Sequence, residues 1–417
     1  MRILWIVNMV LPPLAEHLNI NTGSSGTWMF DIADRLAADE RIDFAVACVH
    51  GSEYRKIETK GTVYYCIPGG GKQMMFYQKK FAAYWKKIVE DFQPDIVNIH
   101  GTEYTHAVSF LRTFPKIKTV ISLQGVLTRI KDKDFGGLSK AKIFKYKTLK
   151  EWLRFNGIYE NHLLHVKNAK YEREMLRRVK YCMVVDDWHR SMGYLINPNL
   201  QFFEVHYNLR QPFYESRKWN IASMHRHEIS TNPGGTALKG IHNLLKAVAI
   251  VKRTYPDVKV KVPGMCGDKN GELIATSGYS KYLKKLIEEL GIKENVVFLG
   301  AQTTEQMLEN MLYSHVQVVP SCIEGPSLVL HEGMHLGVPS IASFRGGMAA
   351  FVDDKVNAFL YDFDEYQYLA LRILQIFEND ALAQKLSANA IVKSEENHDR
   401  NRNYQAYLAM YREIVRK

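Results

Sequence analysis

The sequence has no stretch that approaches the roughly 18 uncharged apolar residues a membrane-spanning helix requires. Cysteine is also scarce, with 5 in 417 residues, and an odd, scattered set favours reduced, packed thiols in a cytoplasmic protein. The apolar start ends at Asn8 without a small-residue cleavage site, so it predicts a buried strand rather than a signal peptide. The composition, 46% hydrophobic and 24% charged, excludes disordered and fibrous classes.

Positive charge is in excess, and it is unevenly distributed. The net charge is +11. Between Leu127 and Lys180 there are fifteen Lys or Arg and six Asp or Glu, which gives that segment a net charge of +9. Such a concentration indicates an anionic partner: a membrane surface, a nucleic acid or a phosphorylated substrate. A pair of solvated helices that keeps the protein soluble is the alternative.

Short β-branched runs alternate with longer amphipathic ones, and this rhythm occurs twice. Alternation of this kind predicts an α/β protein with two parallel sheets, each covered by helices on both faces. We expect a first Rossmann-like domain over residues 1–207, a second over 208–395, and a last helix within 396–417 that crosses back to the first. The expected strands are Ile3–Val7, Phe44–Val49, Val63–Ile67, Ile96–Ile99, Thr119–Leu123, Tyr181–Val185, Phe202–His206, Glu228–Thr231, Val258–Val262, Val296–Leu299, Val316–Val319 and Pro339–Ala342.

The most informative motif follows the expected strand Val316–Val319. Glu324 and Gly325 lead into a predicted helix that begins near Ser327 and Leu328 and carries Glu332 two turns later. Ligands of parallel sheets bind beyond the carboxyl ends of the strands, and the free amides of a helix N-terminus suit a phosphate. The pattern predicts a site for a phosphorylated, polyhydroxylated ligand.

The motif resembles that of retaining glycosyltransferases of family four (glycosyl transferases group 1), which have two glutamates separated by seven residues. The residues that match are Glu324, Gly325, Leu328, Glu332, Met334, Gly337 and Pro339. The resemblance implies the GT-B fold, in which two Rossmann-like domains face each other across a cleft. It implies that Glu324 contacts the donor sugar, Glu332 the ribose, and the amides of Ser327 and Leu328 the phosphates or sugar.

By the same resemblance, the loop after Glu228–Thr231 binds the donor phosphates through Lys239. The family usually has an arginine in this loop, where this sequence has Asn232. Arg345 or Arg210 is a candidate to supply the missing charge. Gly264 resembles a glycine of the turn under the nucleotide base, which is a weak signal by itself.

In the first domain, Gly23 and Gly26 resemble the glycine loop that approaches the donor diphosphate. His100 and Gln124 each follow an expected strand. Many family members have a histidine in place of Gln124, and glutamine cannot titrate. We therefore expect Gln124 to position the sugar, with His100 as a nearby candidate that is as readily a core residue.

The resemblance implies a retaining hexosyltransferase that moves a sugar from a UDP- or GDP-sugar to a glycan or lipid-linked glycan, as in bacterial surface polysaccharide biosynthesis. No metal, further cofactor or nucleic acid is expected. The segment 127–180 would then contact an anionic membrane at the inner face of the plasma membrane. The alternatives are a nucleotide-sugar epimerase of similar fold and a catalytically weak assembly or carbohydrate-binding relative.

Two other patterns need an interpretation. His331-Glu332-Gly333-Met334-His335 matches the zinc-protease pattern H-E-x-x-H, but Gly337 and Pro339 end the helix at once and leave a third ligand hard to supply. Asp186 and Asp187 precede a predicted helix, where capping of the helix explains an aspartate more simply than a metal site.

Overall fold

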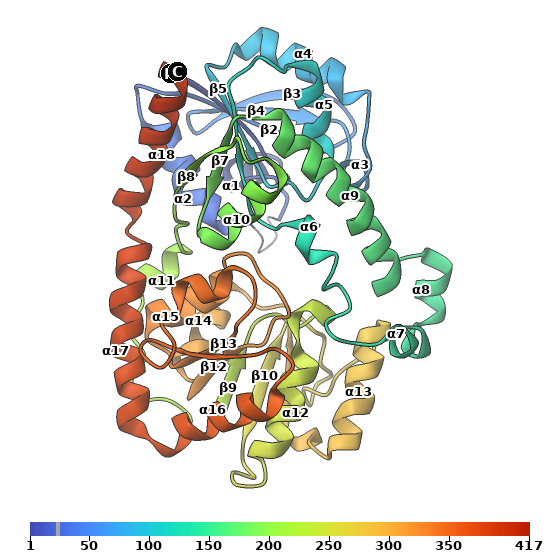
Figure 1. Ribbon diagram of the computed structural model, residues 1–417, viewed down its shortest axis with the longest axis vertical. Coiled ribbons are helices and arrows are strands. Elements are labelled where there is room, and N and C mark those ends of the chain that lie inside the picture. The colour runs from blue at the N-terminus through green and yellow to red at the C-terminus, as the bar shows by residue number, and fades with distance from the viewer. Residues whose placement is uncertain (22–25) are drawn as a thin grey trace. The chain divides into compact units, whose positions relative to one another are not determined.

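The computed structural model describes residues 1–21 and 26–417, and it divides into two compact units (Figure 1). The first unit comprises Met1–Arg129, His165–Asn208 and His398–Lys417, and the second comprises Ile130–Leu164 and Leu209–Asn397. Each unit contains one sheet with helices around it. The predicted α/β architecture with two parallel-sheet units is therefore confirmed.

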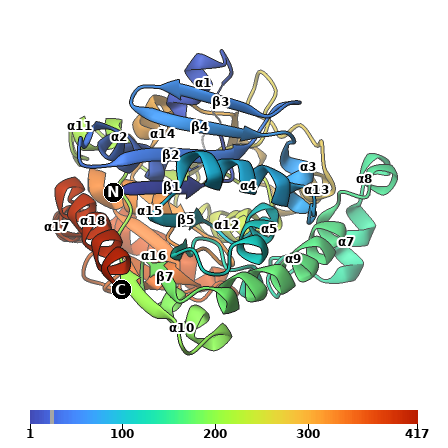
Figure 2. The ribbon, with the colours of Figure 1, turned by 90° about the horizontal axis from the view of Figure 1, so that it is seen from above.

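The first sheet has eight strands in the order β3-β4-β2-β1-β5-β6-β7-β8. Figure 2 shows β3, β4, β2, β1 and β5 following one another in this order. All neighbouring pairs are parallel except β3 and β4, which are antiparallel. Its strands are β1 (Arg2–Ile6), β2 (Asp43–Val49), β3 (Arg55–Thr59), β4 (Thr62–Ile67), β5 (Ile96–His100), β6 (Thr119–Ser122), β7 (Tyr181–Val184) and β8 (Gln201–Glu204). Its helices are α1 (Pro12–His17), η1 (Thr27–Met29), α2 (Phe30–Ala38), α3 (Gly71–Met75), α4 (Phe81–Phe92), α5 (His106–Thr113), α10 (Asp187–Ile196) and α18 (Arg400–Arg416).

The second sheet has six parallel strands in the order β11-β10-β9-β12-β13-β14. They are β9 (Glu228–Thr231), β10 (Lys259–Pro263), β11 (Val296–Gly300), β12 (Val316–Val319), β13 (Ser340–Ser343) and β14 (Phe359–Tyr361). The helices of this unit are α7 (Lys140–Tyr146), α8 (Leu149–Arg154), α11 (Gln211–Glu215), η2 (Ala237–Lys239), α12 (Ile241–Val251), α13 (Gly278–Leu290), η3 (Lys293–Asn295), α14 (Thr304–Leu312), α15 (Leu328–Leu336), η4 (Gly347–Phe351), α16 (Tyr366–Glu378) and α17 (Asp380–Asn397). Two helices, α6 (Leu127–Ile130) and α9 (Ile158–Arg178), have residues in both units.

Residues 130–164 pack with the second unit, whereas the sequence interpretation placed them in the first. The reason is a set of contacts with α13. Tyr146 packs on Tyr282 with ring centroids 5.4 Å apart, and the Glu151 carboxylate accepts the backbone N–H of Gly278 at 3.0 Å. Aromatic packing and a charged hydrogen bond thus attach this segment to the second unit.

The last helix, α18, is part of the first unit. The hydroxyl of Tyr411 lies in the core, where it accepts hydrogen bonds from Trp5 Nε1 at 2.9 Å and Asn98 Nδ2 at 2.7 Å. Asp399 caps the start of the helix by accepting the backbone N–H groups of Asn401 and Arg402. Because buried polar groups need partners, these bonds fix the helix against strands β1 and β5.

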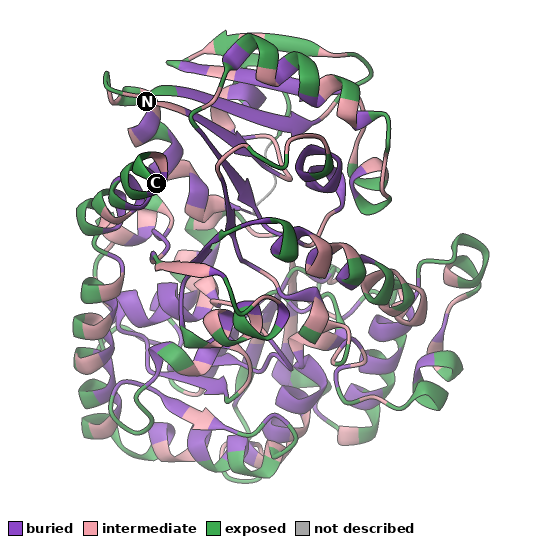
Figure 3. Cartoon of the chain, turned by 45° about the horizontal axis from the view of Figure 1, so that its top comes forward, coloured by how far each residue is buried: buried purple, intermediate pink, exposed green. Residues whose placement is uncertain are grey.

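The cores lie around the sheets, whose central strands are buried in Figure 3. Strands β1 and β12 are almost wholly buried and rich in Val, Ile and Leu, as expected of parallel strands covered on both faces. Four cysteines are buried and Cys266 is exposed, and all five are free thiols. No helix in the described ranges, 1–21 and 26–417, is long and apolar enough to cross a bilayer.

We predict that acidification from pH 7.5 to pH 5 destabilises both units. Burial lowers the pKa of five histidines well below the ordinary 6.5: to about 3 for His100 and His242, and to about 4 for His106, His315 and His398. The unfolded chain takes up these protons near pH 6.5 and the folded chain does not. Stability present above that pH is therefore lost as the pH falls, by about 2 kcal/mol per histidine at pH 5.

Urea unfolding followed at pH 5, 6, 7 and 7.5 measures this effect. The variant His100→Met removes one of the five groups, so its stability should fall less steeply with pH than that of the wild type. Equal unfolding free energies of the wild type at pH 5 and pH 7.5 would contradict the prediction.

Candidate active site

In the second unit, several predicted site residues follow the carboxyl ends of parallel strands. Asn232 follows β9, Gly264 follows β10 and Glu324 follows β12. Because all six strands of this sheet run the same way, these residues lie at one edge of the sheet. That edge is where open parallel sheets bind ligands.

Glu324 is held by two donors at this edge. Its Oε1 accepts a hydrogen bond from Lys239 Nζ at 2.6 Å and another from the Ser321 hydroxyl at 2.6 Å. Ser321 in turn accepts from Asn232 Nδ2 at 2.8 Å. The side chains of Lys239 and Glu324 remain 35% and 17% exposed, so the pair is fixed in place and still open to solvent.

Glycine allows two segments to approach the end of β12 closely. Gly240 has φ +68° and lies against the carbonyl of Pro320, where a Cβ atom would come within 1.8 Å of the oxygen. Gly346 has φ +68° and lies against the backbone of Glu324, with a Cβ position 2.0 Å from its oxygen. The loop that carries Lys239 is thus in direct contact with the segment that carries Glu324. Gly264, at the end of β10, also has a positive φ, +77°.

Helix α15 begins after Gly325, with Ser327 as its N-cap residue and Leu328 as its first residue. The first backbone N–H groups of a helix have no partner within it, and the Ser327 side chain makes no capping bond. This end of the helix therefore presents donors that suit an anion.

Glu332, in the second turn of α15, is buried, with 1% of its surface exposed. Both of its oxygens are bound by Arg210: Nε donates to Oε1 at 2.6 Å and Nη2 donates to Oε2 at 2.7 Å. Burial raises the pKa of this carboxyl, and the Arg210 guanidinium opposes that rise. The sequence interpretation proposed Arg210 as a source of charge for the donor, and the structure shows that its charge is used on Glu332.

The other arginine proposed for that role also has carboxylate partners. Arg345 Nη2 donates to Asp362 Oδ1 at 2.6 Å and to Asp364 Oδ2 at 3.3 Å. Lys239 is therefore the cation that contacts Glu324 directly.

The H-E-x-x-H pattern does not form a zinc site. Its glutamate, Glu332, is bound by Arg210, the His335 ring lies 3.2 Å from the Ser394 hydroxyl, and His331 packs on Phe351 with ring centroids 4.0 Å apart. Across the part of the chain that the structure describes, no three His, Cys, Asp or Glu side chains are grouped to hold a metal ion.

In the first unit, His100 ends β5 and Gln124 follows β6. His100 is buried against Trp5, with ring centroids 4.2 Å apart, and its pKa is lowered to about 3 by burial. This environment is that of a neutral core histidine. Gln124 is also buried, and its backbone carbonyl accepts a hydrogen bond from His189 Nε2 at 2.8 Å.

The remaining predictions in the first unit concern a glycine loop and an aspartate pair. Gly26 has φ +74° and precedes η1, so a positive φ explains the glycine there. Gly23 lies outside the described residues. Asp186 is the N-cap of α10 and accepts the backbone N–H of His189, which confirms the capping interpretation.

Glu103 is a candidate that the sequence interpretation missed. It follows β5, its Oε1 accepts the backbone N–H of Gly125, and burial raises its pKa to about 7. Its Oε2 is buried without a hydrogen-bond partner in the described residues. The signal in the sequence was its position three residues after the strand that ends at His100. The structure places its carboxylate beside Gly101 and Gly125.

Part of the chain matches a known protein family. Residues 235–393 match the family model for glycosyl transferases group 1. Curated relatives include D-inositol 3-phosphate glycosyltransferases from Corynebacterium urealyticum, 33% identical over 143 residues (34% of this chain and 33% of the relative), and from Mycolicibacterium smegmatis, 30% identical over 159 residues (35% and 36%). The matches thus span about a third of the length of these relatives.

Solved structures match over nearly the whole chain. Sucrose-phosphate synthase from Thermosynechococcus elongatus has a TM-score of 0.71 at 15% identity and covers 99% of both chains. HepE from Anabaena, solved with UDP and glucose, has a TM-score of 0.67 at 16% identity and covers 98% of this chain and 99% of that one. At such identities the likeness shows the fold alone. Residues 235–393 are therefore similar to glycosyl transferases group 1, as the motif predicted, and the protein has the GT-B fold.

Proposed function

We propose that this protein is a retaining glycosyltransferase that moves a sugar from a nucleoside diphosphate sugar to a glycan or lipid-linked glycan, in the synthesis of bacterial surface polysaccharide. The observation that carries the proposal is the cluster at the carboxyl edge of the second sheet. There Glu324 is bound by Lys239 and Ser321, and the same segment leads into the N-terminus of α15.

The chemistry of this cluster fits a sugar diphosphate. A carboxylate beside the sugar stabilises positive charge that develops at the anomeric carbon. Lys239 and the backbone N–H groups of a helix N-terminus stabilise the negative charge on the leaving diphosphate. These groups supply both charges, so the proposal requires no metal. HepE, one of the proteins of similar fold, was solved with UDP-glucose, which supports a donor of this class.

In this proposal the second unit binds the donor through Asn232, Lys239, Gly264, Gly325, Ser327, Leu328, Glu324 and Glu332. The first unit binds the acceptor, and its proposed site residues are Gln124, Gly23 and Gly26. His100 then acts through packing.

A thermal-shift screen of UDP, GDP, ADP, UDP-glucose and GDP-mannose tests the proposal. A ligand present at 100 times its Kd adds about 2.7 kcal/mol to the stability of the folded state, so the correct nucleotide should raise the melting temperature by several degrees. Lys239→Met should reduce the shift, and the matched control Lys281→Met, an exposed lysine of α13, should not. No shift with any of these compounds would overturn the proposal.

Product analysis separates the proposed transfer from the two alternatives. A glycosyltransferase releases the nucleoside diphosphate and slowly hydrolyses the sugar nucleotide when no acceptor is present. An epimerase returns the sugar nucleotide with one inverted sugar centre. A protein that binds the sugar nucleotide and leaves it unchanged is a carbohydrate-binding relative.

We further propose that α7 and α8 contact an anionic membrane, which brings the enzyme to a lipid-linked acceptor. Within the basic segment 127–180, the structure confines the exposed apolar surface mainly to α8 and the residue after it. Leu149, Leu153 and Phe155 are 74%, 72% and 75% exposed, and Trp152 is 48% exposed.

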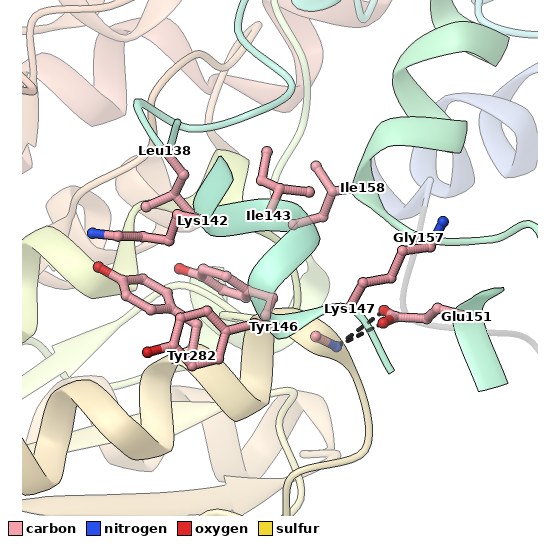
Figure 4. Close-up of a pocket in the computed structure, with 11 residues that line it drawn as sticks. Leu138, Lys142, Ile143, Tyr146, Lys147, Glu151, Gly157, Ile158 and Tyr282 are labelled. Carbon is pink, nitrogen blue, oxygen red and sulfur yellow. Dashed lines mark hydrogen bonds between the residues drawn. The ribbon is translucent and has the colours of Figure 1, made fainter. Parts of the chain in front are cut away.

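One side of α7 and α8 packs against α13 of the same unit. Ile143 is buried, and Tyr146 and Glu151 are turned toward α13 (Figure 4). The exposed cations of these two helices include Lys140, Lys145, Lys150 and Arg154, whereas Lys142 lies over the ring of Tyr282, 5.0 Å from its centroid. Glu151 is the one acidic residue between 139 and 156, and its carboxylate is bound to Gly278. Exposed apolar side chains beside cations that have few acidic neighbours favour binding to an anionic lipid surface.

We predict that the double variant Leu153→Ser/Phe155→Ser binds vesicles at least about tenfold more weakly than the wild type, since two apolar side chains no longer enter the bilayer. Co-sedimentation with phosphatidylcholine vesicles, with and without phosphatidylglycerol, measures the binding. Leu195→Ser, which alters a 70% exposed leucine of α10, is the matched control. A wild-type protein that does not bind the anionic vesicles would contradict the proposal.

A further inference from the structure

Arg210 and Glu332 form a buried ion pair at the proposed donor site. Arg210 binds both carboxylate oxygens, at 2.6 and 2.7 Å, and its third nitrogen, Nη1, donates to the Thr304 hydroxyl at 3.2 Å. The two side chains are 12% and 1% exposed. A paired fork of this kind fixes the plane of a carboxylate as well as its position.

Three separate elements set the geometry of this pair. Arg210 is the N-cap residue of α11, Thr304 is the first residue of α14, and Glu332 lies in α15. The guanidinium also lies over the ring of Phe213, 4.8 Å from its centroid. Since the arginine is held on several sides, it has little freedom to turn away from Glu332.

We infer that Arg210 is a positioning residue for ribose recognition: it keeps Glu332 oriented and ionised, so that the carboxylate accepts hydrogen bonds from the ribose hydroxyls of the donor. This inference rests on the proposed function. An ionised carboxylate offers about four lone-pair sites, and the arginine fork uses two of them. The backbone N–H of Arg210 also faces the carboxylate, which leaves at least one site for a hydroxyl of a ribose diol.

The charge of Arg210 serves a second purpose. A diphosphate that binds near Glu324 and Glu332 meets two negative side chains. Lys239 neutralises the first and Arg210 the second. Without Arg210, burial favours the protonated form of Glu332, which gives up acceptor sites. The arginine therefore allows an anionic ligand and an ionised carboxylate to occupy the same site.

A purely structural ion pair would hold α11, α14 and α15 together without discriminating between nucleotides. The two roles differ in the preference for ribose over deoxyribose. Isothermal titration at pH 7.5 gives the Kd values of UDP and 2′-deoxy-UDP for the wild type and for Arg210→Gln, Arg210→Lys and Glu332→Gln.

We expect the wild type to prefer UDP by about tenfold or more, as for a hydrogen bond to a charged group. Arg210→Gln and Glu332→Gln should each reduce that preference to less than about threefold, within the range of one neutral hydrogen bond. Arg210→Lys keeps the charge but not the fork, so it should retain an intermediate preference. Arg226→Gln is the matched control, because Arg226 makes a similar two-fold contact with Asp380 in the same unit on exposed surface. Its preference should equal that of the wild type.

An Arg210→Gln protein that folds and keeps the wild-type preference would overturn the inference. If Arg210→Gln does not fold, full preference in Arg210→Lys would overturn it equally, and so would tighter binding of UDP by either variant. A wild type that binds UDP and 2′-deoxy-UDP equally well overturns the ribose contact while leaving the proposed function intact. A wild type that binds no nucleoside diphosphate in the thermal screen overturns the proposed function itself.

Discussion

Replacing Glu324 with glutamine is expected to lower kcat by about 10²–10³-fold, the range seen when one electrostatic contact to a transition state is removed. Glutamine has nearly the same shape, but it lacks the charge that stabilises a developing oxocarbenium ion. The side chain is 17% exposed, and the Ser321 bond has a replacement acceptor in the amide oxygen. We therefore expect the melting temperature to change little.

Release of nucleoside diphosphate from the sugar nucleotide found in the thermal screen measures this loss. Glu309→Gln is the matched control, since Glu309 is an exposed residue of α14 in the same unit and should keep wild-type turnover. A Glu324→Gln enzyme with wild-type kcat would show that the carboxylate does not act in the reaction.

Replacing Arg210 with methionine is expected to lower the free energy of unfolding by about 3–5 kcal/mol at pH 7.5, because the buried carboxyl of Glu332 loses its partner and must stay charged or take up a proton. Urea unfolding at pH 7.5 measures the change. The difference from the wild type should shrink as the pH falls toward the ordinary pKa of a glutamate, because the folded variant, with its raised Glu332 pKa, holds a proton that the unfolded chain does not yet hold.

The double variant Arg210→Met/Glu332→Leu separates the cost of an unpaired charge from the cost of altered packing. Apolar replacement of both members of a buried pair is often neutral or stabilising. We therefore expect this variant to recover most of the lost stability and to lose the ribose preference. A single Arg210→Met variant within about 1 kcal/mol of the wild type, the range of an exposed pair, would contradict the prediction.

The strands of both sheets could be predicted from the sequence where they are apolar. All twelve predicted strands are present, with ends that differ by at most two residues. Two strands were missed. β3 (Arg55–Thr59) is an edge strand of mostly charged and polar residues, and β14 (Phe359–Tyr361) has only 3 residues. The first lacks the hydrophobic run that marks a buried strand, and the second is shorter than the roughly four to eight residues of such a run.

The candidate site could be predicted in part, because several of its residues follow predicted apolar strands. Glu324, Asn232 and Lys239 lie in loops that directly follow strands, and a parallel sheet brings such loops to one edge. The contact between Lys239 and Glu324 joins residues 85 apart in the sequence. The sequence indicates that both belong to the same edge, and the structure decides that they form an ion pair.

The sequence by itself determined the two α/β units, the motif that resembles glycosyl transferases group 1 and the residues at the carboxyl edge of the second sheet. These features depend on local patterns: hydrophobic periodicity, glycine at tight turns, and the order of strand, loop and helix. Only the tertiary structure decided that Arg210 binds Glu332 across 122 residues, that His100 is buried against Trp5, and that residues 130–164 pack with the second unit. Each of these depends on which distant side chains meet when the chain folds, and burial then sets their charge and pKa.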